Sequence, residues 1–109
     1  MKKIMGLCEG RHELPVSDYI YEKDFFNQYN MFDFKQMRHQ CYVKLQGVTE
    51  LHLYVTGYTP ALTSVIEFCE YNLISLTLYH FNHDSQTYEK QIMSCDVNYG
   101  LLKEAGYCK

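Results

Sequence analysis

Residues 51–81 read LHLYVTGYTPALTSVIEFCEYNLISLTLYHF, and this stretch decides the fold. Leu51, Leu53 and Val55 alternate with more polar residues, which is the two-residue period of a β-strand. The turn that follows contains Gly57, which lets a backbone come close to a ligand. The start of the stretch therefore predicts a strand that ends in a tight turn.

A helix is expected directly after this turn. Thr59 is a preferred N-cap residue, and Pro60 suits the first helical position, where an N–H group would have no partner. Apolar residues at helical spacing then run from Leu62 to Cys69, and they predict one buried stripe. Asn72 is expected to stop the helix, because Asn tolerates the left-handed conformation found there.

The apolar run from Leu73 to Phe81 predicts a second strand. A strand, a short helix and a strand of this length close as a right-handed parallel crossover. The turn at Gly57 is then expected at the carboxyl end of a parallel strand, where α/β sheets bind their ligands.

The flanking segments extend the same pattern. Residues Ile4–Cys8 predict a first strand buried on both faces, as parallel strands usually are. Residues Leu14–Tyr21 are compatible with an extended piece or with a hairpin arm. Residues Tyr88–Cys95 predict an antiparallel edge strand, because only a short polar loop separates them from the preceding strand.

Helices are expected between and after these strands. Residues Asp33–Leu45 have helical spacing, with Asp33 as the N-cap and Gly47 as the end signal. A shorter helix is also predicted over Asp24–Asn30, and a last short helix is expected through Leu101–Ala105.

The length and the composition predict one folded unit. A chain of 109 residues with 47% hydrophobic and 21% charged residues is typical of a single globular domain. The predicted fold is α/β: a single Rossmann-like domain over residues 1–109, with a small, mostly parallel sheet of about four strands. Helices are expected on the faces of this sheet and an antiparallel hairpin at its edge.

Charge and cysteine usage limit the partners. A net charge of −3 gives no general attraction to nucleic acid or to an anionic membrane, so no double-stranded nucleic acid is expected. Neither a signal peptide nor a membrane-spanning run is recognisable. Five cysteines without a CxxC pair or zinc spacing favour a reducing compartment, so we expect a cytoplasmic protein without metal or cofactor.

Two loops carry the candidate site residues, residues 9–14 and residues 56–59, and they converge if their strands are neighbours. The N–H groups of Ala61 and Leu62 at the helix start are expected to attract negative charge. Arg11 could pair with a phosphate, and His12 is the candidate catalytic acid. The predicted ligand-binding residues are Gly10, Arg11, Thr56, Gly57, Thr59 and Thr63.

A plainer interpretation stays open. A strand followed by Gly, Thr, Pro and a helix is also ordinary turn and capping chemistry, and Arg11 and His12 could be solvated loop residues. The chain has neither GxxxxGK[ST] nor GxGxxG, so nucleoside triphosphate hydrolysis and dinucleotide binding are not indicated. It also has neither GxSxG nor HExxH.

Residues 54–62, YVTGYTPAL, resemble the strand, loop and helix of CRISPR-associated Rossmann-fold (CARF) sensor domains. The resemblance implies a cyclic oligoadenylate held at a homodimer interface by two loops, which here would be residues 9–14 and 56–63. CARF domains carry more strands than this chain can hold. The resemblance therefore points to a reduced relative, such as a stand-alone ring nuclease or a viral counter-defence protein that sequesters a nucleotide signal.

Three functions compete on this evidence. The leading hypothesis is a module that binds a phosphate-bearing small molecule, either a nucleotide or a cyclic oligonucleotide signal. The second is a metal-independent phosphodiesterase or ring nuclease in which His12 or His52 transfers a proton. The third is a non-catalytic homo-oligomeric protein, suggested by the 11 tyrosines and by an edge strand near Tyr88.

Overall fold

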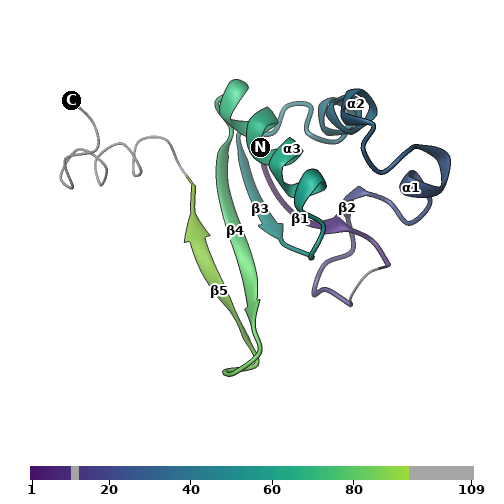
Figure 1. The fold of residues 1–109 in the computed structure, drawn as a ribbon. Coiled ribbons are helices and arrows are strands. Elements are labelled where there is room, and N and C mark those ends of the chain that lie inside the picture. Colours follow the sequence, from purple (N-terminus) through teal and green to yellow (C-terminus); the bar gives the residue numbers. More distant parts are fainter. Residues whose placement is uncertain (11–12, 94–109) are drawn as a thin grey trace, which may run out of the picture.

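Five strands form one sheet in the order β2-β1-β3-β4-β5 in the computed structural model, which describes residues 1–10 and 13–93 (Figure 1). Strands β1 to β4 are parallel, and β5 pairs with β4 in the antiparallel direction. The strands are β1 (Lys2–Cys8), β2 (Tyr19–Tyr21), β3 (Glu50–Tyr54), β4 (Ser75–Asn82) and β5 (Thr87–Ile92). The predicted α/β class with a mostly parallel sheet and an antiparallel edge hairpin is confirmed.

The fifth strand is β2, which the sequence left open between an extended piece and a hairpin arm. It pairs in parallel with β1, with Gly6 opposite Tyr19 and Cys8 opposite Tyr21. A three-residue strand has too short a pattern to be recognised from alternation alone. It nevertheless makes β1 an interior strand of the sheet.

Helices α2 (Phe34–Lys44) and α3 (Thr59–Tyr71) lie on the same side of the sheet, and a short helix α1 (Phe25–Gln28) precedes them (Figure 1). The connections from β2 to β3 and from β3 to β4 both move in the same direction across the sheet. Right-handed crossovers that move in one direction place their helices on one face. Within the described residues, no helix covers the other face.

The core lies between this sheet face and the two helices. Alternate strand residues are fully or nearly fully buried there, and the helices contribute buried residues of their own. These core residues are Met5, Leu7, Leu51, Leu53, Leu76, Leu78, Met37, Cys41, Val65 and Cys69. Burial raises the pKa of the Cys41 thiol to about 11 and that of Cys69 to about 12, so both are neutral apolar side chains at neutral pH.

At Gly6, the opposite face of β1 is covered by Tyr19 of β2 and by Leu14 from the loop that follows β1. A Cβ atom at Gly6 would lie 2.6 Å from the ring of Tyr19 and 3.0 Å from Cδ1 of Leu14. Gly6 is therefore the residue that lets this loop pack directly on the strand. Leu14 is held against β1 as a result.

The start of α3 differs from the prediction. Tyr58, not Thr59, is the N-cap, and the helix already begins at Thr59. The N–H group of Tyr58 donates to the carbonyl of Thr56 at 2.9 Å, which tightens the turn by one residue. The N–H group of Leu62 consequently donates to the carbonyl of Tyr58 at 3.2 Å, so the expectation that it is free for a ligand is wrong.

The end of α3 is a Schellman motif. Asn72 is the C-cap as predicted, but its φ is −98°, and the left-handed residue is Leu73 with a φ of 56°. Ile74 donates to the carbonyl of Cys69 at 2.8 Å, and Leu73 donates to that of Glu70 at 3.4 Å. The Asn72 side chain instead donates to the carbonyl of Phe68, which explains why it sits at the helix end.

The remaining predictions have mixed outcomes. Asp33 caps α2 as expected, since its side chain accepts from the N–H group of Gln36 at 3.1 Å. The helix predicted through Leu101–Ala105 lies outside the described residues. Within the described residues, no helix is both long enough and apolar enough to cross a membrane.

Candidate ligand-binding site

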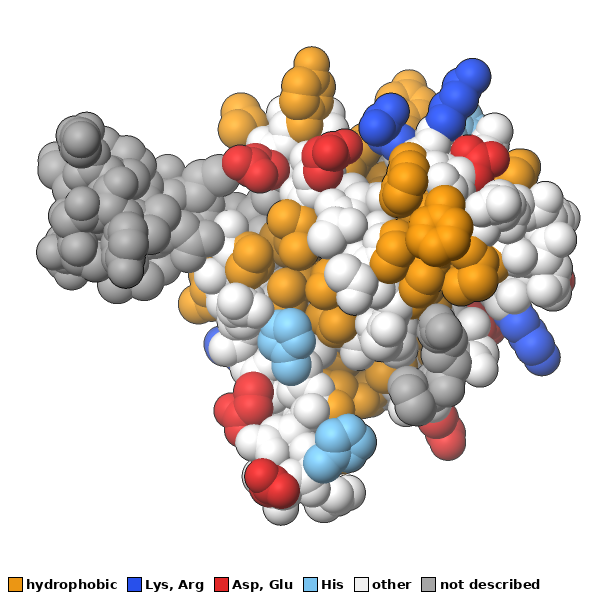
Figure 2. Space-filling view, viewed as in Figure 1, with side chains coloured by type: hydrophobic (Ala, Val, Ile, Leu, Met, Phe, Trp, Pro, Cys, Tyr) orange, Lys and Arg blue, Asp and Glu red, His pale blue; other side chains and the backbone are white. Residues whose placement is uncertain are grey.

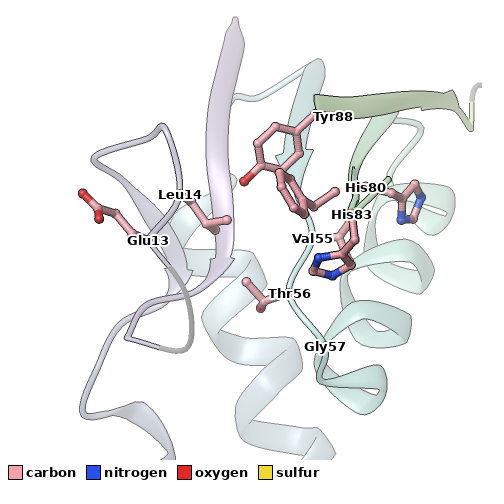
Figure 3. Close-up of a pocket in the computed structure, with 9 residues that line it drawn as sticks. Glu13, Leu14, Val55, Thr56, Gly57, His80, His83 and Tyr88 are labelled. Carbon is pink, nitrogen blue, oxygen red and sulfur yellow. The ribbon is translucent and has the colours of Figure 1, made fainter. Parts of the chain in front are cut away.

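A hollow of about 520 Å³ opens at the carboxyl rim of the parallel strands (Figure 3). Strands β1 and β3 are neighbours, so the loops after them meet at one rim, as the sequence predicted. The hairpin between β4 and β5 closes the third side. The lining residues are Glu13, Leu14, Val55, Thr56, Gly57, His80, Phe81, His83 and Tyr88.

Only part of the predicted site is assembled here. Thr56 and Gly57 line the hollow, whereas Thr59 and Thr63 do not. The hydroxyl of Thr63 donates to backbone carbonyls of its own helix, at 3.1 Å from both Thr59 O and Pro60 O, on an exposed face.

The first loop contributes differently from the prediction. Gly10 has a φ of 89° and packs near the Lys23 side chain, and it is not among the lining residues. Arg11 and His12 lie outside the described residues, so the phosphate contact and the catalytic role predicted for them stay predictions. The described residues that this loop contributes to the hollow are Glu13 and Leu14.

Thr56 has the most unusual environment at the rim. Its exposed fraction is 4%, and its hydroxyl has no hydrogen-bond partner within the described part of the chain. Leaving a buried polar group unpaired costs roughly 1–3 kcal/mol. Since Thr56 lines the hollow, a ligand there could supply the missing partner.

Gly57 leaves open space beside Thr56. A Cβ atom at this position would have no other atom within 4 Å. The φ of Gly57 lies outside the left-handed region, so the turn itself does not require glycine. The absence of a side chain instead keeps the backbone accessible from the hollow.

Aromatic rings form the hairpin side of the hollow. Phe81 on β4 lies opposite Tyr88 on β5, with ring centroids 5.3 Å apart and planes at 66°. His83 packs edge-on against Phe81 at 4.9 Å. Figure 3 shows His83 and Tyr88 reaching from the hairpin toward the side that carries Thr56 and Leu14. Such rings offer stacking surfaces to a planar ligand.

The other polar residues that line the hollow are less available to a ligand. The Nε2 atom of His80 lies 2.8 Å from the Gln91 side-chain oxygen, so His80 is held by β5. Figure 3 shows the carboxylate of Glu13 pointing away from Thr56. Thr56 and His83 are therefore the side chains best placed to bond a ligand in the hollow.

The hollow has little positive charge in the described part of the chain. None of its described lining residues is lysine or arginine. Figure 2 shows histidine and acidic side chains on the hairpin side of the view, and both basic and acidic side chains over the helical side. No group of three or more His, Cys, Asp or Glu residues among those described could hold a metal ion.

Reasoning from the sequence alone missed the hairpin contribution. His83 is an exposed residue of the hairpin loop, yet it also lines the hollow. The short loop predicted a hairpin, and counting back along both strands would have placed Tyr88 opposite Phe81. The pairing register of the hairpin could therefore have predicted the aromatic side of the hollow.

Comparisons with protein-family models, with curated proteins and with solved structures find no match for this chain. The resemblance to CARF domains therefore stays a prediction, and the case for function rests on the geometry of the rim.

Proposed function

We propose that this chain is a binding module for a phosphate-bearing small molecule, a nucleotide whose base occupies the rim hollow. The observation that carries the proposal is the buried, unpaired hydroxyl of Thr56 beside the open backbone of Gly57. A hydroxyl in this position is stabilised when a ligand accepts from it or donates to it.

The shape and the lining of the hollow support a planar base. A volume of about 520 Å³ falls within the range of small-molecule sites. Phe81, Tyr88 and His83 supply ring surfaces, and Leu14 and Val55 supply apolar contacts on the other sides. A base that stacks on the rings could direct its hydrogen-bonding edge to Thr56.

The phosphate is assigned to the start of α3. This helix has 13 residues and begins two positions after Gly57, so the partial positive charge of its first turn lies next to the rim. The N–H groups of Thr59 and Ala61 belong to that first turn and have no intrahelical acceptor. Arg11 remains a predicted additional contact.

The test is a thermal-shift and calorimetric titration with mononucleotides, dinucleotides and cyclic nucleotides. We expect at least one of them to raise the melting temperature, and Thr56→Val to weaken its binding about 2- to 12-fold, the equivalent of one lost hydrogen bond. Thr63→Val is the matched control, since it removes a threonine hydroxyl outside the hollow. No shift with any of these ligands at millimolar concentration would refute the proposal.

A further inference from the structure

Five aromatic side chains form a continuous row on the sheet face that α2 and α3 leave uncovered. The row consists of His52, Tyr79, Tyr54, Tyr88 and Phe81, in order of contact. The centroids of successive rings lie 5.8, 4.7, 4.8 and 5.3 Å apart. Its last two members line the rim hollow, so the row connects the middle of the face with the proposed binding site.

Strand alternation and register produce this row. His52 and Tyr54 occupy alternate positions of β3, between the buried leucines that face the helices. Tyr54 lies opposite Tyr79 on β4, and their rings stack with planes at 10°. The row therefore crosses three neighbouring strands without interruption.

The row is accessible and has polar edges. Tyr54, Tyr79 and Tyr88 are half-buried, and Phe81 is 38% exposed. Lys90 lies opposite Tyr79 in register, which places a positive charge on the same face. The Nδ1 atom of His52 lies 2.8 Å from the Tyr79 hydroxyl, and its Nε2 atom is hydrogen bonded to Glu50.

This chemistry fits a single-stranded nucleic acid better than a second copy of the chain. A dry protein interface would bury the tyrosine hydroxyls together with the hydrogen-bonded pair of His52 and Glu50, and burying charged groups is costly. The hydrogen bond to His52 holds the pKa of Glu50 below its ordinary value, so this carboxylate stays charged at neutral pH. A nucleotide strand can stack its bases on rings while its backbone stays in water.

We infer that the ring row extends the rim hollow into a surface for a single-stranded oligonucleotide, so that the ligand carries at least two bases. The inference rests on the proposed function, because the first base is assigned to the rim hollow. A second base would contact Tyr54 and Tyr79, with Lys90 near the intervening phosphate.

Calorimetry with adenosine 5′-monophosphate and with linear adenylates of two and four residues tests this inference, since purines have the largest stacking surface. We expect the tetranucleotide to bind the wild-type chain at least 10-fold tighter than the mononucleotide. Tyr54→Leu should remove most of this gain and leave mononucleotide affinity within about twofold. Tyr42→Leu, an exposed ring on α2, is the control and should change neither affinity.

A second measurement serves if Tyr54→Leu fails to fold. The ring signals of Tyr54 and Tyr79 in wild-type protein with labelled tyrosine should move with the tetranucleotide and not with the mononucleotide. Mononucleotide binding without a gain for the longer ligands, or with unmoved ring signals, would overturn the inference and leave the proposed function intact. If neither the mononucleotide nor the longer adenylates bind, the inference is overturned, whereas the proposed function is refuted only if the whole nucleotide panel fails to bind. If Tyr54→Leu changes the oligomeric state and leaves ligand affinity unchanged, this face is a contact between copies of the chain. That result would also overturn the inference.

Discussion

The hydroxyl of Thr56 is expected to contribute to ligand binding and not to the stability of the fold. Its position at the end of β3 was predicted from the alternation in residues 51–55, and so was its place in the turn. Its burial was not predicted, because burial depends on how distant parts of the chain pack together, and Leu14 and the hairpin residues that line the same hollow are far from Thr56 in the sequence. A hydroxyl that forms no bond inside the described protein adds nothing to the stability of the free chain.

Substitution of this hydroxyl should therefore leave stability intact. We expect Thr56→Val to have a free energy of unfolding equal to that of the wild type or up to about 1 kcal/mol higher, because an unsatisfied buried polar group is removed at nearly constant shape. Urea unfolding followed by circular dichroism measures this difference. A decrease of more than about 1 kcal/mol in the free energy of unfolding would mean that the hydroxyl has a partner within the protein. The hydroxyl would then not need a ligand as its partner, which would contradict the proposed site.

Helix α3 shows which features of a helix can be predicted from the sequence. Its apolar stripe and its stop at Asn72 were predicted correctly, because local spacing and end chemistry determine them. The predicted N-cap was wrong by one residue, since a backbone hydrogen bond between Tyr58 and Thr56 tightened the turn. The left-handed position fell on Leu73 rather than Asn72, and residue preference alone does not separate two neighbouring positions.

Leu73 offers a direct test of the helix end. It is 84% exposed and left-handed, a conformation that costs a residue with a Cβ atom about 1–2 kcal/mol. We expect Leu73→Gly to be more stable than Leu73→Ala by about 1 kcal/mol, because alanine removes the same exposed side chain and keeps the strain. Urea unfolding of the two variants provides the comparison, and equal stability would rule out strain at this position.

At the scale of the whole molecule, the sequence predicted the layers better than the site. The parallel crossovers and the edge hairpin followed from local patterns, so β1, β3, β4 and β5 were all expected. The strand order followed less directly, because β2 has three residues and no clear pattern. The aromatic side of the hollow depends on the pairing register between β4 and β5, so the pattern of either strand alone did not predict it.

A second hollow, of about 530 Å³, lies between α2 and α3 and competes with the rim as a binding site. It is lined by apolar side chains such as Tyr42 and Phe68 together with Lys35, Arg38 and Glu67. No unpaired buried polar side chain is found among its described lining residues, in contrast to Thr56 at the rim. We therefore place the ligand at the rim.

The most direct test of this placement is a titration of the ¹⁵N-labelled chain with the nucleotide that gives the largest thermal shift, followed through backbone amide signals. We predict that the largest shifts occur at Thr56, Gly57 and Tyr88, while Tyr42 and Phe68 between the helices stay unmoved. Shifts concentrated at Tyr42 and Phe68, or no shifts at millimolar nucleotide, would contradict a nucleotide site at the carboxyl rim.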